Sequence, residues 1–376
     1  MIDELVKLRR LLHSQPELSG KEERTAHQIL TFLEEYSPDR LVTEIGGFGL
    51  AAIYNGKAPG PRILIRCELD ALPIPETIKL PYESGSPGIA HKCGHDGHMA
   101  IIAGVAMQLY KHPPAKGSTV LLFQPSEETG EGAELVLGDQ KFKEIEPDYV
   151  FALHNLPGFK MGRVILSDGL FASASSGLAV YLQGDTSHAA EPNSGRSPAL
   201  AVAQLIQAIS CVPQFYTALH ETAQATIIHA ELGEIAFGTS PGRASVMATL
   251  RSHSEKTMDL LVEKSTEFAK RIAATYDLEV EVDLMQPFPP TVNDSEATEI
   301  IRQSAHGLDM ETEVLAVPFG WSEDFGHFTS RYKGALFGLG AGESQPALHH
   351  PEYDFPEDLI EPGVKLFIKV IRSLTG

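Results

Sequence analysis

The sequence predicts an α/β protein in which a mixed, mostly parallel sheet is sandwiched by helices and interrupted by a smaller α+β domain. Three observations predict this class. Short runs of Ile, Leu, Val and Phe alternate with helical patterns before residue 174, and such continuous runs are typical of strands buried on both faces. Residues 174–287 show a different order of strand-like and helical patterns, and the first order returns after them. At 376 residues, the chain is also long for one core.

The first part of the chain contains strands that end in polar residues. We expect these buried strands at 62–70, 118–128 and 148–155. An amphipathic pattern predicts a helix at the chain start, and helical patterns, apolar in the second case, predict helices at 22–35 and at 98–110. A helix at 294–306 and the strand-like "GALFGLGAG" continue this pattern late in the chain. We therefore expect one discontinuous domain made of residues 1–173 and 288–376.

Residues 174–287 have the order β-α-β-β-α-β. The strand "SGLAVYLQG" precedes a helix with Pro198 close to its start, and the strands "AQATIIHAELG" and "ASVMATLRSHS" follow. The next helix is amphipathic, with Ser254 as its expected cap, and "LEVEVDLM" is the last strand. This order is the split βαβ arrangement, also called ferredoxin-like, and predicts a separate α+β domain.

Composition excludes several classes of partner. The net charge of −20 argues against nucleic acid and anionic membranes, because binding phosphates needs clustered Lys and Arg. No apolar stretch is expected to cross a membrane, and the chain start reads as an amphipathic helix rather than a signal peptide. The three scattered cysteines do not suit a disulfide framework, so we expect a reducing, cytoplasmic location.

The segment "HKCGHDGHMA" at 91–100 concentrates groups that bind metals. A polar turn before a helix is the simpler interpretation, but each apolar run of the first domain also ends in chemically active side chains. The carboxyl ends of strands in an open α/β sheet form the ligand crevice, so these groups can converge there. They are Glu68, Asp70, Cys93, His95, Asp96, His98, Glu127, Glu128, His154, His349 and His350.

This set of residue types favours zinc, since thiolate and imidazole are good zinc ligands and a carboxylate can complete or bridge a site. There are more candidate ligands than one tetrahedral ion needs, which favours a two-metal centre. Adjacent Glu127 and Glu128 can then divide the work, one binding metal and the other taking a proton from the attacking water.

Nine signatures are spread in order across nearly the whole chain: "RRLLHSQPELSGKE", "RCELDALP", "HKCGHDGHMA", "FQPSEETGEGA", "ALHNLPG", "SHAAEP", "ATLR", "SEDFGHF" and "LHHPEYDF". In these signatures the chain resembles the M20 peptidase family. The resemblance is to the branch of aminoacylase-like N-acetyl-amino-acid deacetylases, hippurate hydrolases and auxin-conjugate hydrolases, and it implies a zinc-exopeptidase-like catalytic domain.

The resemblance implies roles for individual residues. Glu127 matches the general base, which activates water and later protonates the leaving amine. Asp70 matches a supporting aspartate, whereas Glu68 stands where this branch more often has Asp, so it is either structural or tunes the site. His13 is expected to pack or cap. The implied metal ligands are Cys93, His95, Glu128, His154 and His349.

Residues 174–287 resemble the family's lid and dimerisation domain, which implies a homodimer. His188 matches a histidine that reaches the neighbouring subunit's active site and polarises the scissile carbonyl, although a surface loop histidine is the simpler interpretation. Arg251 matches an arginine that grips a substrate carboxylate, or else it makes a surface ion pair.

Two departures from the family pattern concern the lid. This chain has "GTSP" at 238–241, so Gly238 replaces an asparagine that relatives can place against the substrate. Asn193 stands where a second histidine is expected after "SHAAEP". Substrate contacts from the lid are therefore expected to differ from those of relatives.

The leading hypothesis is metal-dependent hydrolysis of an N-acyl, most simply N-acetyl, amino acid. Two divalent ions are expected, zinc first, with manganese or cobalt as alternatives. A dipeptidase or carboxypeptidase acting on short peptides uses the same bond chemistry, although "HKCGHD" favours the acyl-amino-acid branch. A catalytically silent metal-binding homologue is the third hypothesis. The "SEE" at 126–128 argues against it, because a protein without activity could readily lose Glu127.

Overall fold

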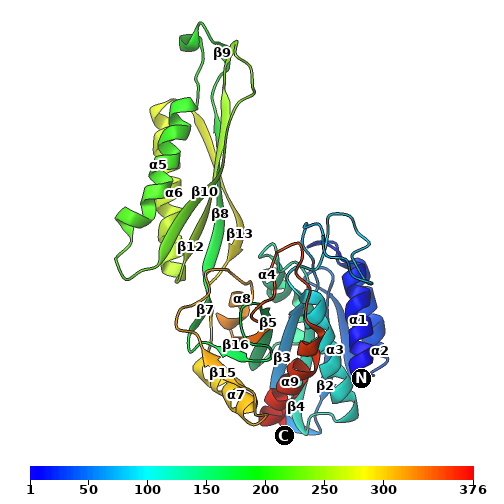
Figure 1. The fold of residues 1–376 in the computed structure, drawn as a ribbon. Helices are drawn as coiled ribbons and strands as arrows, with labels where there is room; N and C mark the ends of the chain where they lie inside the picture. The colour runs from blue at the N-terminus through cyan, green and yellow to red at the C-terminus, as the bar shows by residue number, and fades with distance from the viewer. The chain divides into compact units, whose positions relative to one another are not determined.

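The computed structural model describes residues 1–376, which form two compact units (Figure 1). The first unit consists of Met1–Phe171, Thr291–Pro318 and Asp324–Gly376. The second consists of Ala172–Pro290 and Phe319–Glu323. The chain thus changes unit close to the predicted bounds, and the segment Phe319–Glu323, which we expected in the first domain, belongs to the second unit.

An eight-stranded mixed sheet forms the centre of the first unit, in the order β1-β2-β4-β3-β5-β16-β6-β15. The four central strands β4, β3, β5 and β16 run parallel, and β15 is parallel to β6. The pairs β1–β2, β2–β4 and β6–β16 are antiparallel. The predicted mixed, mostly parallel sheet is confirmed. Its strands are Arg40–Ile45 (β1), Gly49–Asn55 (β2), Ala58–Glu68 (β3), Lys116–Gln124 (β4), Tyr149–Leu156 (β5), Val164–Leu166 (β6), Thr312–Val314 (β15) and Lys333–Gly340 (β16).

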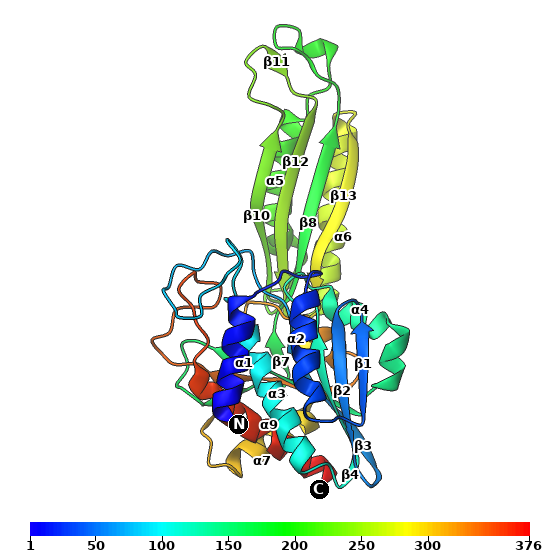
Figure 2. The same cartoon turned by 90° about the vertical axis from the view of Figure 1, so that its right-hand side faces the viewer.

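Helices cover this sheet because its central strands are apolar on both faces. In β3, Ile63, Leu64 and Ile65 are all completely buried although successive side chains point to opposite faces. The long helices α3 and α9 each contact both β3 and β4. The short helix α4 contacts β4, and the short helix α8 contacts β16. In Figure 2, α1 and α2 lie beside α3. The helices are Ile2–Ser14 (α1), Glu23–Glu34 (α2), His95–Lys111 (α3), Gly132–Gly138 (α4), Ser295–His306 (α7), Gly326–Thr329 (α8) and Ile360–Thr375 (α9).

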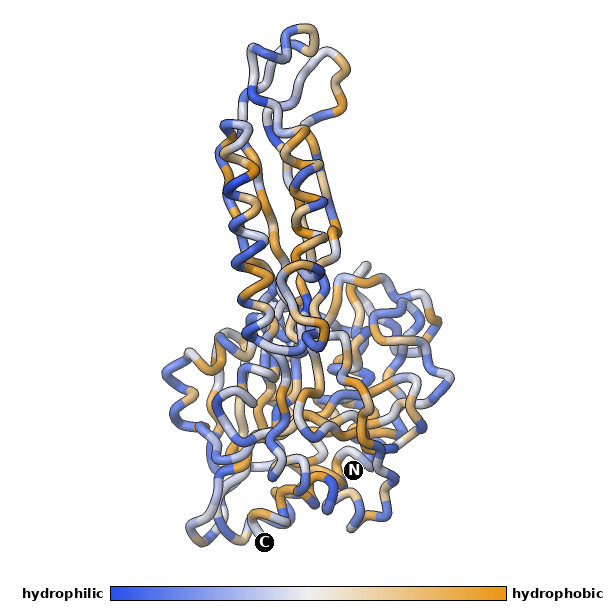
Figure 3. The backbone as a smooth tube through the Cα atoms, turned by 90° about the vertical axis from the view of Figure 1, so that its left-hand side faces the viewer, coloured by the Kyte–Doolittle hydropathy of each residue, from blue (hydrophilic) through white to orange (hydrophobic).

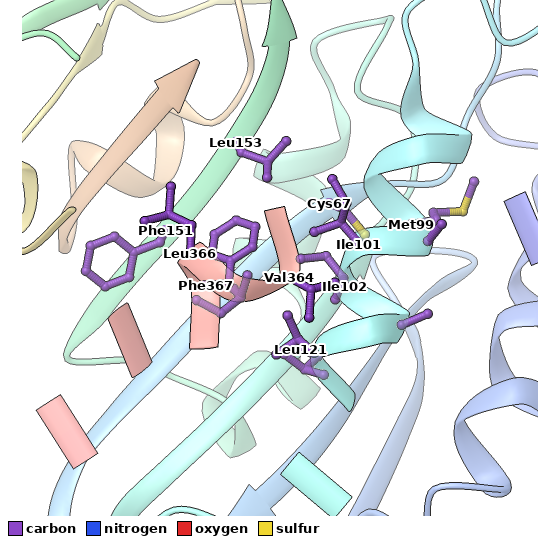
Figure 4. Packing of buried hydrophobic residues seen from close by; sticks show 14 of the residues in the cluster. Cys67, Met99, Ile101, Ile102, Leu121, Phe151, Leu153, Val364, Leu366 and Phe367 are labelled. Carbon is purple, nitrogen blue, oxygen red and sulfur yellow. The ribbon is translucent and has the colours of Figure 1, made fainter. Parts of the chain in front are cut away.

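The main core lies between the sheet and the helices α3 and α9 (Figure 4). Ile101 and Ile102 of α3 pack with Val364 of α9 and with Leu121 of β4. Each such side chain stabilises the fold by roughly 1.5–3 kcal/mol when fully buried. Gly104 permits the close approach of the two helices, since a Cβ there would lie 2.5 Å from a methyl carbon of Val364.

Several element ends differ from the prediction by a few residues, and the two largest differences beside the candidate site are at the end of β4 and the start of α3. The strand predicted to reach residue 128 ends at Gln124, because Pro125 has no N–H for the ladder and Ser126 has a left-handed backbone with φ of 56°. The helix predicted from residue 98 begins at His95, directly after Gly94, whose φ of 91° is left-handed. The segment after β4 and the start of α3 are therefore held in specific turns.

The second unit contains a four-stranded antiparallel sheet in the order β10-β12-β8-β13. With two helices, the chain order is β-α-β-β-α-β, so the predicted split βαβ arrangement is confirmed. Ser254 caps α6, accepting a hydrogen bond from the Thr257 N–H at 3.2 Å. Figure 3 shows hydrophobic segments recurring along both helices. The elements are Ala174–Gln183 (β8), Ala199–Tyr216 (α5), Ala223–Leu232 (β10), Arg243–Ser252 (β12), Glu255–Thr275 (α6) and Glu279–Phe288 (β13).

Short elements complete both units. They are the strands Leu170–Ala172 (β7), Ser187–His188 (β9), Thr239–Ser240 (β11) and Thr291–Val292 (β14), and the 3₁₀ helices Gln140–Glu144 (η1), Pro192–Ser194 (η2) and Glu357–Leu359 (η3).

Helix α5 is long and apolar enough to cross a membrane by length and composition alone. We had expected no segment of that kind. One face of the helix packs on the sheet of the second unit, where Leu205 and Ile209 are completely buried. Core helices of soluble domains pass the same test, so α5 is weak evidence for a membrane.

Candidate active site

The five predicted metal ligands meet at the carboxyl ends of the parallel strands in the first unit. Cys93 lies in the loop before α3, and His95 begins that helix. Glu128 follows β4, His154 lies near the end of β5, and His349 lies in the loop after β16. Their ligand atoms form overlapping groups in which all members lie within 4.8 Å of one another. Two groups contain predicted ligands alone: Cys93 with His95 and His154, and Cys93 with Glu128 and His349. Two further groups join predicted ligands to other residues: His95 and Glu128 with Glu127, and His95 with Glu68 and His98.

The spacing of these atoms suits cations placed between them. Sγ of Cys93 lies 3.5 Å from Nε2 of His154. Nε2 of His95 lies 3.9 Å from an oxygen of Glu128, which also has an oxygen 3.7 Å from Nε2 of His349. Donors around one zinc ion lie about 3–4 Å apart, because metal–ligand bonds are about 2.0–2.3 Å long. The overlap of the groups means that neighbouring ions would share this donor set.

Hydrogen bonds orient two of the histidines for binding a metal through Nε2. Nδ1–H of His95 donates to the carbonyl of Asp70 at 2.9 Å, and Nδ1–H of His154 donates to the carbonyl of Asn155 at 2.8 Å. Such bonds fix the tautomer and leave the other ring nitrogen as an electron-pair donor. Nε2 of His95 is buried and has no hydrogen-bond partner. Because an unsatisfied buried polar atom is costly, this atom fits a metal ligand.

The electrostatics of the site also favour cations. Burial would lower the pKa of His95, but the carboxylates of Glu68, Glu128 and Asp70 outweigh it and raise that pKa to about 10. Burial and the neighbouring His98 lower the pKa of His154 to about 3, which keeps this imidazole neutral. The carboxylates therefore create a field that attracts positive charge, while His154 stays available as a neutral ligand.

Two residues beside the cluster have a left-handed backbone, which is rare outside glycine. Ser126 precedes the two glutamates with φ of 56°, and His349 has φ of 66°. Such conformations cost about 1–3 kcal/mol and persist where surrounding contacts determine them. Here the Ser126 N–H donates to Glu22 at 2.8 Å, and the His349 N–H donates to the carbonyl of Lys92 at 2.8 Å.

Glu127 lies beside the donor groups with its side chain buried. One of its oxygens is 3.9 Å from Nε2 of His95, and the other accepts a hydrogen bond from the Asp324 N–H at 3.4 Å. Glu128 lies between His95 and His349. The adjacent glutamates thus differ in position, as a division between metal ligand and general base requires.

Asp70 supports two of the predicted ligands. Its Oδ2 accepts hydrogen bonds from the Ser19 hydroxyl at 2.7 Å and from the Glu128 N–H at 2.9 Å. Its carbonyl accepts the bond from His95 described above. Burial would raise the pKa of Asp70, but the bond and charge of His95 lower it. Asp70 is therefore placed to position His95 and Glu128.

Glu68 is completely buried and its carboxylate is already paired. It accepts a hydrogen bond from Nδ1 of His98 at 2.7 Å and forms an ion pair with Arg66. Nε2 of His98 accepts the Asn155 N–H at 3.2 Å, so the proton of this ring is on Nδ1. The Glu68 carboxylate thus bridges Arg66 and His98.

A buried ion-pair network surrounds Asp96, which lies in the segment 91–100, and this network was not predicted. Nε of Arg9 lies 2.7 Å from Asp96, and Nδ1 of His13 lies 2.8 Å from the same carboxylate. Nε2 of His13 also contacts Glu76 at 2.9 Å. His13, expected to pack or cap, thus belongs to an ionic network. A signal was present, since Arg9 and His13 lie four residues apart on the buried face of an amphipathic helix.

His188 and Arg251 belong to the second unit. His188 is exposed in β9, and its Nδ1 accepts the Ala190 N–H at 3.1 Å. Arg251 is half-buried and donates to the carbonyl of Gly320 at 2.7 Å and to the Ser322 hydroxyl at 3.2 Å. The structure therefore groups neither residue with the metal ligands, and their roles toward a substrate stay predictions. Arg251 makes no ion pair, which contradicts the alternative of a surface salt bridge.

Gly238 lies next to His188 in the second unit, where its carbonyl accepts the Ala189 N–H at 3.0 Å. A Cβ at Gly238 would meet no atom within 4 Å, and its φ is not left-handed. We expect Gly238→Asn to change Tm by less than about 2 °C, since surface substitutions cost within about 0.5 kcal/mol. A thermal melt checks this. A larger loss would mean that the backbone at 238 requires glycine, in which case the missing lid asparagine has a structural reason.

The chain resembles known proteins along its whole length. Peptidase family M20/M25/M40 matches residues 64–373. N-acetyldiaminopimelate deacetylase of Bacillus velezensis is 32% identical over 373 residues, which is 97% of each chain. The Listeria monocytogenes protein of that name is 30% identical and covers 99% of this chain and 100% of its own. Both are close enough over their full length to indicate common descent.

Solved structures have the same fold. A Bacillus subtilis protein described as a dinuclear metal-binding peptidase of the M20 family is 27% identical, with a TM-score of 0.82 over 99% of this chain and 97% of its own. A Staphylococcus aureus protein described as an aminohydrolase has a TM-score of 0.89 at 24% identity over 100% of this chain and 97% of its own, and shows the fold alone. With the converging Cys, His and Glu ligands, these matches establish that the chain belongs to peptidase family M20/M25/M40, as an amidohydrolase.

Proposed function

We propose that this enzyme hydrolyses the amide bond of an N-acetyl amino acid, releasing acetate and a free amino acid, with two divalent metal ions. The observation that carries the proposal is the set of overlapping donor groups, with the Glu127 carboxylate beside them. Zinc fits the thiolate and imidazole ligands best, and manganese and cobalt are alternatives. Ions held there would act as Lewis acids on the amide carbonyl and on the attacking water.

The residues of the chain supply positions and proton transfer. Cys93, His154 and the other ligands hold the ions, while Asp70 orients His95 and Glu128 through hydrogen bonds. Glu127 takes a proton from the attacking water onto a carboxylate oxygen. It then delivers that proton to the leaving nitrogen, which departs as the free amine. The C–N bond breaks once the new C–O bond has formed. The second proton of the attacking water, left on the product carboxyl group, passes to the amine or to solvent, which gives the carboxylate and balances atoms and charges.

The relatives at 30–32% identity support the proposed substrate class. Since their names specify N-acetyldiaminopimelate, we propose an N-acetylated amino acid with a free carboxylate, and N-acetyldiaminopimelate as the first compound to test. Arg251 is the proposed partner of the carboxylate, because it carries no ion pair and presents a guanidinium fork. His188 is the proposed donor to the scissile carbonyl.

We further propose a cytoplasmic homodimer that forms through the second unit. Strand β10 lies at an edge of its sheet, paired only with β12, and its Ile228 side chain is exposed. An exposed edge strand can pair with another chain. Light scattering at micromolar concentration tests the dimer. The cytoplasmic location is proposed because a thiolate ligand at Cys93 needs a reducing environment.

The experiment measures amine release from N-acetyl amino acids and dipeptides. Protein stripped of metal with a chelator is assayed alone and after zinc, manganese or cobalt is restored. We expect release from the acetylated compounds only with metal. Cleavage of dipeptides alone would replace the proposal with a dipeptidase. No turnover from either set by metal-loaded protein would overturn the proposal.

A further inference from the structure

The side chain of Asn155 connects three segments that carry predicted metal ligands. It directly follows His154 in β5 and is completely buried. Its Nδ2 donates a hydrogen bond to the carbonyl of Cys93 at 2.7 Å, and its Oδ1 accepts one from the Tyr353 hydroxyl. One amide therefore joins β5, the loop before α3 and the loop after β16.

The orientation of this amide is determined by its partners. The carbonyl of Cys93 only accepts hydrogen bonds, so the nitrogen must face it. Nδ2 also lies 3.0 Å from Nε2 of His98, which is an acceptor because His98 carries its proton on Nδ1. Both amide hydrogens and the oxygen are thus engaged. An asparagine satisfies this arrangement, and an aspartate cannot make the two donations.

Glycine packing holds the amide in place. A Cβ at Gly94 would lie 2.6 Å from Nδ2 and 2.7 Å from Oδ1 of Asn155, so the amide lies flat against the main chain between Cys93 and His95. Gly94 also has the left-handed backbone that starts α3. The turn that presents the two ligands is therefore shaped around this side chain.

The third segment is held by Tyr353 and by Lys92. The hydroxyl of Tyr353 donates a hydrogen bond to Asn155. The main-chain carbonyl of Tyr353 accepts a hydrogen bond from the Lys92 ammonium at 2.8 Å. His349, four residues earlier, donates its N–H to the carbonyl of Lys92 at 2.8 Å. The loop that carries His349 is thus attached both to the loop before α3 and to Asn155.

We propose that Asn155 is a positioning residue that sets the mutual distances of Cys93, His154 and His349 and so determines the affinity for the metal ions. This inference rests on the metal centre of the proposed function. Asn155 is not a ligand, since every polar atom of its amide is used within the protein. Groups that hold metal ligands in place commonly contribute about 10- to 100-fold to metal affinity.

The test compares zinc affinity of the full chain with and without the amide donor. Asn155→Asp keeps the size and the acceptor for Tyr353, but its side chain cannot donate to Cys93 or His98, whereas the main-chain N–H of residue 155 still donates to His98. We expect its zinc affinity, measured by competition with a chromophoric chelator, to fall about 10- to 100-fold. The thiolate absorption of the cobalt-loaded protein should also change. Extra negative charge alone would raise the affinity for a cation, so a loss separates positioning from charge.

Asn293 provides a matched control in the same unit. It is buried, its Nδ2 donates to the Leu336 carbonyl at 2.8 Å, and its Oδ1 accepts the Leu336 N–H at 2.9 Å. None of its partners lies in a segment that carries a metal ligand. Asn293→Asp should lower thermal stability while zinc affinity changes by less than about twofold. A loss of affinity as large as that of Asn155→Asp would overturn the proposal, because general destabilisation would explain both.

Tyr353→Phe keeps the proposal testable if Asn155→Asp does not fold, since it removes one hydroxyl. We expect a smaller loss of zinc affinity, about threefold to tenfold, because Lys92 still holds the loop. Unchanged affinity in every folded variant would overturn the inference. Wild-type protein that binds zinc without turnover would overturn the proposed function alone, and the affinities would still decide the role of Asn155. Wild-type protein that binds no zinc would overturn both.

Discussion

Glu127→Gln is expected to lower kcat by about 10²- to 10⁴-fold, the usual contribution of a general base. Glutamine keeps the size of the side chain and the oxygen that accepts from the Asp324 N–H, but it cannot take a proton from water. Zinc content should stay at the wild-type value, because the five predicted ligands are unchanged. The measurement is steady-state turnover of the best acetylated substrate, together with metal analysis of the same sample.

Glu131→Gln is the matched control for this prediction. Glu131 lies in the same segment after β4, but its side chain is exposed. Neutralising it should leave kcat within about twofold of wild type. If Glu127→Gln retained most of its turnover, another group would have to be the base. If it lost metal together with turnover, Glu127 would be a ligand instead.

Arg9→Met is expected to lower stability by about 3–5 kcal/mol, because it leaves the Asp96 carboxylate buried beside His13 without its main counter-charge. Burial would raise the pKa of Asp96, but Arg9 and then His13 hold it well below its usual range. Removing the guanidinium withdraws the larger of these stabilising charges. Thermal denaturation should show a decrease in Tm of roughly 4–10 °C.

Arg10→Met is the control for this effect on the same helix. The side chain of Arg10 is 46% exposed, and its ion pair with Glu357 lies at the surface. Such pairs contribute about 0–1 kcal/mol, so Tm should change by a few degrees at most. Equal losses in the two variants would mean that lost packing of the arginine stem, rather than the buried charge, is responsible.

Much of the fold was predictable because it depends on local patterns. The runs "RILIRC" and "VLLFQ" are apolar on both faces, which indicates strands covered from two sides, and these are β3 and β4. The order of the second unit was predictable from four strand-like and two helical segments that follow one another in the sequence. The hairpin β1–β2 was not predicted, although its strands are adjacent in the chain and Gly46 and Gly47, both with a left-handed backbone, form the turn between them.

The candidate site was predictable where its residues are chemically distinctive. Cys93 and His95 lie in one short segment, and the other ligands follow buried strands, so their convergence follows from a parallel sheet. The role of Asn155 was not predictable, because an amide that joins a strand to two loops has no periodic or compositional signal. The contacts between Arg9 and Asp96 and between Tyr353 and Asn155 bring together residues far apart in the sequence.

The sequence by itself determined the class of fold and the chemical type of the site, since apolar periodicity selects secondary structure and residue type selects metal chemistry. Only the tertiary structure decided which nitrogen of each histidine faces the site, which carboxylates are paired and what holds the ligand loops. These properties depend on the directions of hydrogen bonds between separate elements and on distances that must be correct to a few tenths of an ångström. Packing of the whole first unit sets those distances, and no local segment of the chain encodes them.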